Sequence, residues 1–347
     1  MRPLLSFRAP LLALTACAAL AGCTSPSATN SAAPSGGGPG ASGTLTIGVM
    51  PKQKGIPYFN ACEKGAQEAA KELGDVNLVY DGPIEDQSEK QSSMLDTWVT
   101  RRFNAVAVAC NDPEQISASL ARARDQGIAV VTYDADANPE TSKRQFFVNQ
   151  ADAAAIAKAL VDEMAAQVGE DAKVAVVSSS STAPNQVAWL KEMDTYAKAS
   201  HPKLTVVTIE YAGEDQQKAR QKAESILKAY PDVKGIYGMT SVAFPGAAQA
   251  VDGAGQAGKV AVVGLGTPNV MKDFVKRGVV KTVILWNPVD LGYLTLYVAR
   301  ATAKGELKEG DTTFKAGRLG EKQVKGSVVL LGEPMKFTKD NIDQYDF

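Results

Sequence analysis

The stretch AVAVACNDPEQISASLARARDQGIAVVTYD, residues 105–134, contains two short apolar runs separated by a polar segment of helical length. The runs AVAVAC (105–110) and IAVVTYD (128–134) are rich in valine and predict strands. The continuous apolar character of the first run suits a strand covered on both faces, as in a parallel sheet. Parallel strands joined by a helix form right-handed crossover units, so this stretch predicts an α/β fold.

The same alternation continues from residue 44 onward. Amphipathic segments of helical length separate most of the apolar runs, which indicates helices between strands. Further strands are predicted at 44–50, 77–82, 145–149, 173–179, 204–211, 233–239, 259–265 and 281–287. So many strands are unusual in one open sheet, and 347 residues are enough for two domains. We therefore predict an α/β protein with two doubly wound parallel-sheet lobes.

The N-terminal region has a different composition from the rest. Arg2 and Arg8 form a positive n-region, and a short apolar run follows and ends in LAGC at 20–23. This order resembles a bacterial lipoprotein signal peptide at 1–22, in which Cys23 receives the lipid. Two alternatives stay open, namely a similar box ending at Cys17 and an ordinary signal peptide with an incidental cysteine at position 23.

Residues 23–43 hold the lipidated cysteine and a run of small and polar residues, which predicts a flexible tether. We therefore expect an extracytoplasmic protein that is lipid-anchored to the cell membrane at Cys23. No other stretch is long and apolar enough to cross a bilayer. In an oxidising compartment Cys62 and Cys110 either pair or remain as two buried thiols, and the sequence leaves both possibilities open.

Several functional classes are disfavoured by the composition. The chain has 37 basic and 38 acidic residues and no basic block, so we expect no nucleic-acid partner. The single histidine, His201, excludes most histidine-based metal sites and catalytic triads. The run DADAN at 134–138 matches the start of a calcium-binding loop, but Pro139 and Gln145 occupy positions that require glycine and glutamate. We expect no catalytic residues, no metal and no cofactor, and therefore no enzyme.

In open α/β sheets, ligands bind beyond the carboxyl ends of the strands. The residues there are carboxylates, amides, hydroxyls, a lysine and aromatics, and they suit a polyhydroxylated small molecule. The candidate ligand-binding residues are Lys52, Tyr58, Phe59, Asp112, Asp134, Asn185, Gln186, Met239, Ser241, Trp286 and Asn287. Three alternatives stay open: Asp112 as a helix N-cap, Trp286 as core between the lobes and Lys52 as a solvated charge. Asp136 is expected to support Asp134 or to cap a loop.

Several motifs in order resemble a known family. They include VMPKQKGIPYF (49–59), YDGP (80–83), VVTYDAD (130–136), STAPNQVAW (181–189), VGLGTPNVM (263–271), LWNPVDLGY (285–293) and FTKDNIDQYDF (337–347). Their order and spacing from Thr44 to Phe347 are similar to those of substrate-binding proteins of sugar ABC importers, in the ribose-binding type. Within that type the chain resembles the branch with rhamnose-binding and autoinducer-2-binding proteins.

The resemblance implies two lobes that close on a ligand by hinge motion and deliver it to an ABC permease, with the protein acting as a monomer. The chain is expected to cross between the lobes near Asn149, near Asn287 and within about 314–328. The N-terminal lobe would then comprise 44–148 and about 288–313. The C-terminal lobe would comprise 149–287 and about 320–347.

The same resemblance assigns roles to individual residues. It implies that the cleft is lined by Lys52, Asp134, Asn185 and Gln186, with Met239 and Ser241 opposite, and that Phe59 and Trp286 sandwich the ligand. Three of these positions depart from those of autoinducer-2 receptors, namely Asn185, Met239 and Ser241. The segments TAPNQ, MTSV and AGRLG look more like those of rhamnose binders, and Met239 or Val242 suits the methyl group of a 6-deoxy sugar. We therefore favour rhamnose or a related sugar, with autoinducer-2 as the alternative.

Overall fold

The computed structural model describes residues 43–85 and 87–347. The predicted signal peptide, Cys17, Cys23 and nearly all of the predicted tether lie outside the described residues. Among the helices of the described part, none has both the length and the apolar character needed to cross a membrane. The described residues contain a strand at each of the ten places predicted from the sequence, so the α/β prediction is confirmed.

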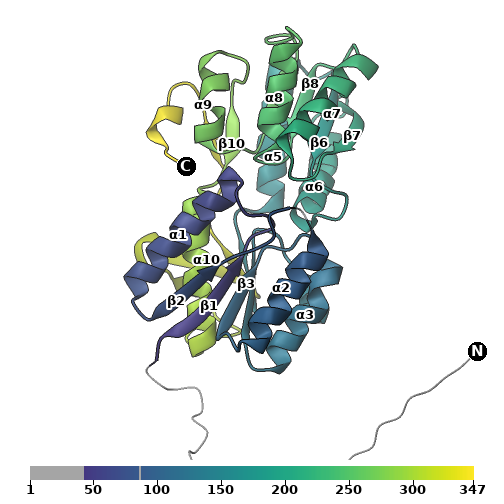
Figure 1. Cartoon of the computed structure of the whole chain (residues 1–347). Coiled ribbons are helices and arrows are strands. Elements are labelled where there is room, and N and C mark those ends of the chain that lie inside the picture. Colours follow the sequence, from purple (N-terminus) through teal and green to yellow (C-terminus); the bar gives the residue numbers. More distant parts are fainter. Residues whose placement is uncertain (1–42, 86) are drawn as a thin grey trace, which may run out of the picture. The chain divides into compact units, whose positions relative to one another are not determined.

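The first lobe is built on a sheet with the strand order β11-β12-β13-β5-β4-β3-β1-β2 within the described residues. Figure 1 shows β2, β1 and β3 side by side in this sheet. Strands β1 to β5 and β13 run parallel, and β11 and β12 add antiparallel pairs at one edge. The strands are β1 (Leu45–Met50), β2 (Val76–Tyr80), β3 (Ala105–Val108), β4 (Ala129–Tyr133), β5 (Phe146–Asn149), β11 (Thr313–Lys315), β12 (Glu321–Lys325) and β13 (Val328–Leu330).

Helices cover both faces of this sheet, as the apolar strands require. On one face α1 and α10 pack against each other and against Val49, Ala107 and Val131. On the other face α2 and α3 pack against Val106 and Val130 (Figure 1). The helices are α1 (Pro57–Leu73), α2 (Ser88–Thr100), α3 (Pro113–Asp125), the short α4 (Pro139–Ser142) and α10 (Pro288–Lys304).

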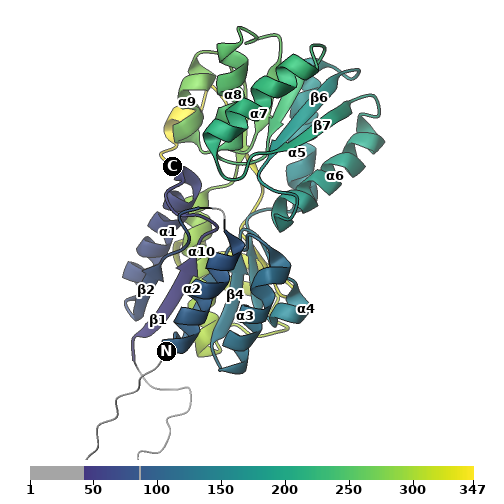
Figure 2. The same cartoon turned by 45° about the vertical axis from the view of Figure 1, so that its right-hand side comes forward.

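The second lobe has a parallel sheet with the order β7-β6-β8-β9. A bridge between Leu265 and Ile284 adds β10 beside β9, and β10 pairs antiparallel with β14. Helices α5 and α6 pack together, as do α7 and α8 (Figure 2). The elements are β6 (Lys173–Ser178), β7 (Thr205–Tyr211), β8 (Gly235–Gly238), β9 (Ala261–Gly264), β10 (Val283–Leu285), β14 (Met335–Phe337), α5 (Ala153–Val168), α6 (Pro184–Ser200), α7 (Gln216–Ala229), α8 (Ala243–Gly253) and α9 (Pro268–Lys276).

The chain passes between the two sheets three times. It leaves the first sheet after β5 at Asn149, returns after β10 through Trp286 and Asn287 to α10, and leaves again after β13. The expected third crossing within about 314–328 is wrong, because β13 pairs with β5 as far as Leu330 and only β14 joins the second sheet. Residues 320–330 therefore belong to the first lobe. A short apolar run such as Val328–Leu330 does not indicate from sequence which sheet it joins.

Two glycines bring α1 and α10 into direct backbone contact. A Cβ atom on Gly65 would lie 1.7 Å from the carbonyl oxygen of Val289, and one on Gly292 would lie 1.9 Å from that of Cys62. Cys62 is buried in the core on this face of the sheet, whereas Cys110 belongs to the core on the other face. Both thiols are free, so the alternative of two buried thiols is confirmed.

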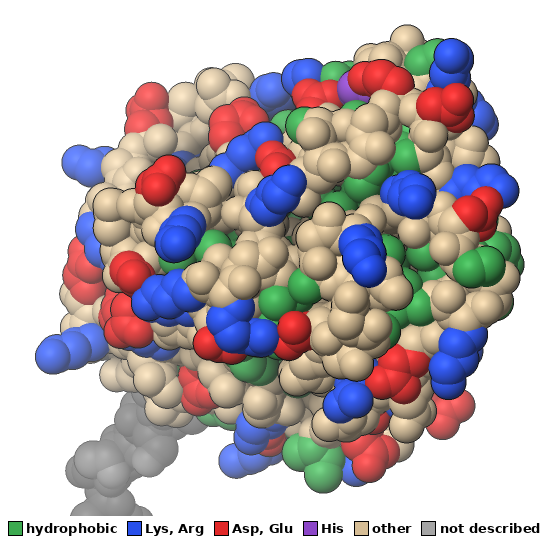
Figure 3. Space-filling view, turned by 90° about the horizontal axis from the view of Figure 1, so that it is seen from above, with side chains coloured by type: hydrophobic (Ala, Val, Ile, Leu, Met, Phe, Trp, Pro, Cys, Tyr) green, Lys and Arg blue, Asp and Glu red, His purple; other side chains and the backbone are tan. Residues whose placement is uncertain are grey.

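The surface carries charges of both signs. On the face shown in Figure 3, basic and acidic side chains of the described residues are interspersed. Nucleic-acid binding usually needs a basic stripe or patch, and this face has no such feature.

Candidate ligand-binding site

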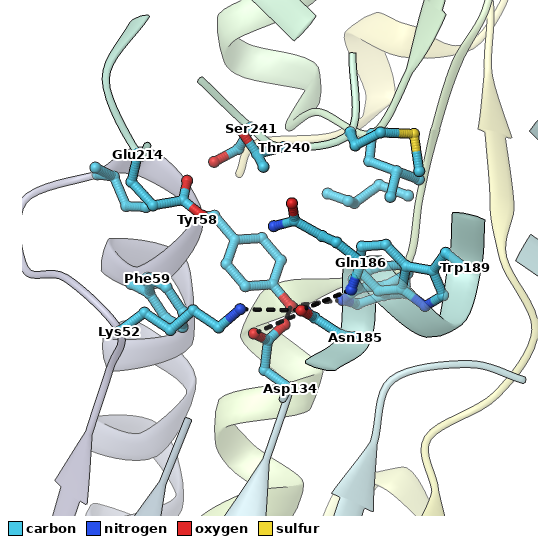
Figure 4. A pocket seen from close by; sticks show the side chains of 15 residues that line it. Lys52, Tyr58, Phe59, Asp134, Asn185, Gln186, Trp189, Glu214, Thr240 and Ser241 are labelled. Carbon is cyan, nitrogen blue, oxygen red and sulfur yellow. Dashed lines mark hydrogen bonds between the residues drawn. The ribbon is translucent and has the colours of Figure 1, made fainter. Parts of the chain in front are cut away.

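A cavity lies between the two lobes at the carboxyl ends of their strands (Figure 4). Its empty space is about 370 Å³, including open solvent at its mouth. It is lined by Lys52, Ile56, Tyr58, Phe59, Asp134, Asn185, Gln186, Trp189, Glu214, Met239, Thr240, Ser241, Leu265, Leu285 and Trp286. All of the predicted ligand-binding residues except Asp112 and Asn287 are therefore brought together here.

Asp134 directly follows β4 and is only 4% exposed. Its φ of 60° lies in the left-handed region, which Asp tolerates better than most residues. The phenolic hydroxyl of Tyr58 donates to its Oδ1 at 2.8 Å, and the amide of Asn185 donates to its Oδ2 at 3.4 Å. Burial raises the pKa of Asp134, while the charge of Lys52 and the hydrogen bond from Tyr58 act in the opposite direction.

Lys52 follows β1 and is 3% exposed, so the alternative of a solvated loop charge is excluded. Its Nζ donates to Oδ1 of Asn185 at 2.9 Å. Its backbone carbonyl accepts from the amide of Asn111 at 3.1 Å, which fixes the loop. Asn185 is the second residue of α6 in the second lobe, and its side chain contacts both Lys52 and Asp134 of the first lobe.

Gln186 has an amide group of fixed orientation. Its Oε1 accepts from the backbone N–H of Ser179 and from the Ser179 hydroxyl, both at 2.9 Å, and also from the Ser178 hydroxyl. Because the oxygen already accepts several bonds, the amide nitrogen is the part of Gln186 that can serve a ligand, as a donor.

Aromatic rings form a continuous cluster around the cavity. The rings of Tyr58 and Trp286 are perpendicular with centroids 6.1 Å apart, and Trp189 lies 5.8 Å from Trp286. The indole Nε1 of Trp286 donates to the hydroxyl of Tyr58 at 2.9 Å. Trp286 is only 3% exposed and also lines the cavity, so it is both buried between the lobes and part of the site.

Two residues predicted to bind the ligand, Asp112 and Asn287, lie outside the cavity and cap helices. Oδ1 of Asp112 accepts from the backbone N–H groups of Glu114 and Gln115, both at 3.0 Å, and Oδ1 of Asn287 accepts from Val289 and Asp290 in the same way. Each is the N-cap of the helix that follows, α3 or α10, and neither lines the cavity. Their side chains serve the first helical turn, so their expected place in the site is corrected.

Asp136, the second aspartate of the DADAN run, lies outside the cavity lining. Its carboxylate forms a two-point ion pair with Arg144, with distances of 2.8 and 2.6 Å, and accepts from the Thr132 hydroxyl. Asp136 therefore holds the loop after β4. Among the described residues, no group of His, Cys, Asp and Glu side chains is arranged to hold a metal ion.

Some lining residues were absent from the predicted set. Glu214 follows β7, so the same rule of strand ends could have found it. Trp189 lies one helical turn beyond Gln186, and the helical period of α6 is its only sequence signal. Leu265 and Leu285, also absent from the predicted set, follow or end β9 and β10, and the predicted Met239 follows the neighbouring strand β8. These three residues therefore form an apolar patch on one wall of the cavity.

Comparison with known proteins identifies the family of the chain. The family model of the periplasmic binding protein domain matches residues 47–307. The D-allose-binding periplasmic protein of Escherichia coli is 28% identical over 254 residues, which are 70% of this chain and 80% of that protein.

Solved structures show the same similarity over most of the chain. The chain is similar to LsrB from Clostridium saccharobutylicum in complex with AI-2, with a TM-score of 0.83 and 28% identity over 87% of this chain and 100% of that one. It is similar to an ABC transporter solute-binding protein from Clostridium phytofermentas with bound L-rhamnose, with a TM-score of 0.83 and 29% identity over 88% and 99%. A sugar ABC transporter protein from Actinomyces odontolyticus is 35% identical over 87% and 98%, with a TM-score of 0.70.

The family match covers far more than half of the chain, and these relatives are binding proteins of transporters. The resemblance seen in the sequence is thereby confirmed. The chain belongs to the periplasmic binding protein family, whose members work outside the cytoplasm, and within it resembles the sugar-binding proteins of ABC importers, so that it is a substrate-binding protein and not an enzyme.

Proposed function

We propose that the cavity captures one monosaccharide, rhamnose or a related 6-deoxy sugar, and that the protein delivers it to the permease of an ABC importer. The observation that carries the proposal is the composition of the cavity wall. Buried polar groups of Lys52, Asp134 and Gln186 can exchange hydrogen bonds with hydroxyls, and aromatic rings can cover C–H faces.

The apolar patch of Met239, Leu265 and Leu285 supports a ligand with an apolar end. A hydroxymethyl group placed there would lose its hydrogen bonds to water, which is unfavourable unless a partner replaces them. A methyl group has no such requirement. The likeness to the L-rhamnose-bound relative agrees with this choice.

Autoinducer-2 is the alternative ligand, because the relative in complex with AI-2 is as similar in fold as the rhamnose-bound one. In this alternative the protein is a receptor or uptake protein for a furanosyl signal. Asn185, Met239 and Ser241, which depart from the pattern of such receptors, favour the sugar.

We also propose where the protein is located in the cell. We infer that the protein acts as a monomer, anchored outside the cytoplasm by a lipid on Cys23 and a tether that ends at residue 43. The order of charged region, apolar run and cysteine box in the sequence supports this part.

Calorimetric titration of the purified protein tests the ligand. L-rhamnose is expected to bind more tightly than L-mannose, which differs by one hydroxyl on the carbon that would face the apolar patch. Preference for L-mannose would contradict the assignment of that patch. Failure of every monosaccharide at millimolar concentration would exclude the sugar, and tighter binding of autoinducer-2 would establish the alternative.

A further inference from the structure

A chain of two hydrogen bonds connects the second crossing between the lobes to the carboxylate of the cavity. The indole Nε1 of Trp286 donates to the hydroxyl of Tyr58 at 2.9 Å. That hydroxyl donates to Oδ1 of Asp134 at 2.8 Å, and Figure 4 shows both Tyr58 and Asp134. The three residues come from the end of β10, the start of α1 and the end of β4. All three side chains are buried.

The chemistry of the groups sets the direction of this chain. An indole N–H is a donor only, so the oxygen of Tyr58 accepts from Trp286. A phenol has one proton, and with Trp286 as donor that proton is directed to the carboxylate of Asp134. The hydroxyl of Tyr58 thus donates its only proton within the protein, and it has no proton left to donate to a ligand.

The carboxylate of Asp134 has two oxygens with unequal surroundings. Oδ1 receives the 2.8 Å bond from Tyr58, whereas Oδ2 receives a longer bond of 3.4 Å from Asn185. Oδ2 is then the oxygen with the greater remaining capacity for a ligand hydroxyl.

We propose that Tyr58 is a positioning residue, whose hydroxyl, oriented by Trp286, holds Oδ1 of Asp134 so that Oδ2 is presented to a hydroxyl of the ligand. This inference rests on the proposed binding of a sugar in the cavity. It assigns to Tyr58 a role distinct from ring stacking.

Ionisation of Asp134 gives a readout of this role. Of the described residues, Lys52 and Tyr58 are the titratable groups that lower its pKa. Burial and, in addition, the charge of Asp134 raise the pKa of the tyrosines and cysteines around it, which are Tyr58, Cys62, Tyr80, Cys110 and Tyr133. These tyrosines and cysteines therefore stay neutral in acid. Loss of the Tyr58 hydroxyl removes one of the influences that lower the pKa of Asp134.

The test is Tyr58→Phe, which keeps the ring and removes the hydroxyl. Titration with L-rhamnose at several pH values should show affinity reduced roughly tenfold near neutral pH, as expected for a lost hydrogen bond to a charged group. The loss of affinity in acid should begin at a higher pH than in wild type, because Asp134 is protonated more easily. In an Asp134→Ala background, where the Tyr58 hydroxyl has no carboxylate to hold, Tyr58→Phe should cause little further change.

Tyr237→Phe is the matched control. Tyr237 is 1% exposed, its hydroxyl has no hydrogen-bond partner among the described residues, and it does not line the cavity. This variant should leave both the affinity and its pH dependence unchanged. If Tyr58→Phe lowers the melting temperature but leaves the pH dependence of affinity as in wild type, its role is structural and the proposal is overturned.

A measurement on the ligand-free protein tests the role of Tyr58 independently of the proposed binding of a sugar. The chain has 3 tryptophans, so the indole N–H resonances can be assigned by replacing one tryptophan at a time. The resonance of Trp286 should shift as Asp134 is protonated in wild type and should lose that response in Tyr58→Phe. If wild type binds no sugar but the resonance behaves in this way, the sugar fails and the hydrogen-bonded chain stands. A Trp286 resonance that responds equally in both proteins overturns the chain.

Discussion

Replacement of Gly292 by alanine tests the contact between α1 and α10. The new Cβ atom would lie 1.9 Å from the carbonyl oxygen of Cys62, 2.6 Å from its carbonyl carbon and 2.8 Å from its Cα. All of these are backbone atoms of α1, so no side-chain rotation relieves the clash and the helices must move apart. Overpacking of this kind reduces the free energy of unfolding by about 1–3 kcal/mol.

Two opposing effects decide the sign of this change. Within a helix, alanine is intrinsically better than glycine by up to about 1 kcal/mol. That gain is smaller than the clash, so Gly292→Ala is expected to be destabilising. Gly65→Ala should behave alike, because its Cβ atom would lie 1.7 Å from the carbonyl oxygen of Val289.

Gly253→Ala is the control for helix propensity alone. Gly253 ends α8, and the nearest atom to its new Cβ would be the Nη2 of Arg220 at 4.0 Å. Its stability should stay equal to that of wild type or rise by up to about 1 kcal/mol.

Urea unfolding measures the free energy of unfolding of all three variants. The slope of this free energy against urea concentration is expected to be the same as in wild type. Because α1 carries Tyr58 and Phe59 at its start, Gly292→Ala should also weaken ligand binding. If Gly292→Ala is as stable as wild type while Gly253→Ala behaves as expected, α1 and α10 are not in backbone contact and the reasoning fails.

Three further predictions concern the site, the pH dependence and the anchor. Asp134→Ala should reduce affinity for the sugar by about 1–3 kcal/mol in a calorimetric titration, whereas Asp112→Ala should leave affinity unchanged and lower stability by about 1 kcal/mol, as for a lost N-cap. The pKa of His201 is raised in the folded protein by hydrogen bonds to the carboxylates of Asp162 and Glu170. Its stabilising contribution is therefore full below about pH 6.5 and lost as the pH rises through the raised pKa. Wild type should accordingly exceed His201→Gln in free energy of unfolding by more at pH 5.5 than at pH 9, and an equal difference at both pH values contradicts this. Cys23→Ser should abolish incorporation of a labelled fatty acid and release the protein from membranes, and membrane retention of this variant would contradict the anchor.

The rule that ligands bind at strand ends identified most of the residues of the site. It could not distinguish ligand-binding residues from residues that cap the following helix. Asp112, Asp134 and Asn287 all follow the end of a strand by a few residues. Asp112 and Asn287 each directly precede a proline that begins a helix. Their side chains accept hydrogen bonds from free backbone N–H groups in the first turn of that helix. Asp134 lines the cavity and has a left-handed backbone conformation, which the sequence does not indicate.

Sequence alone determined the alternation of strands and helices, the two lobes and the edge at which the site lies. These features depend on local periodicity and strand direction, which nearby residues specify. Tertiary structure decided which residues meet. Lys52 and Asn185 are 133 positions apart, Tyr58 and Trp286 are 228 apart, and β13 joins β5 across the same kind of separation. No local pattern in the chain specifies a partner so distant in sequence. Such pairings arise from how the strands assemble into sheets and how the helices pack on the faces of these sheets.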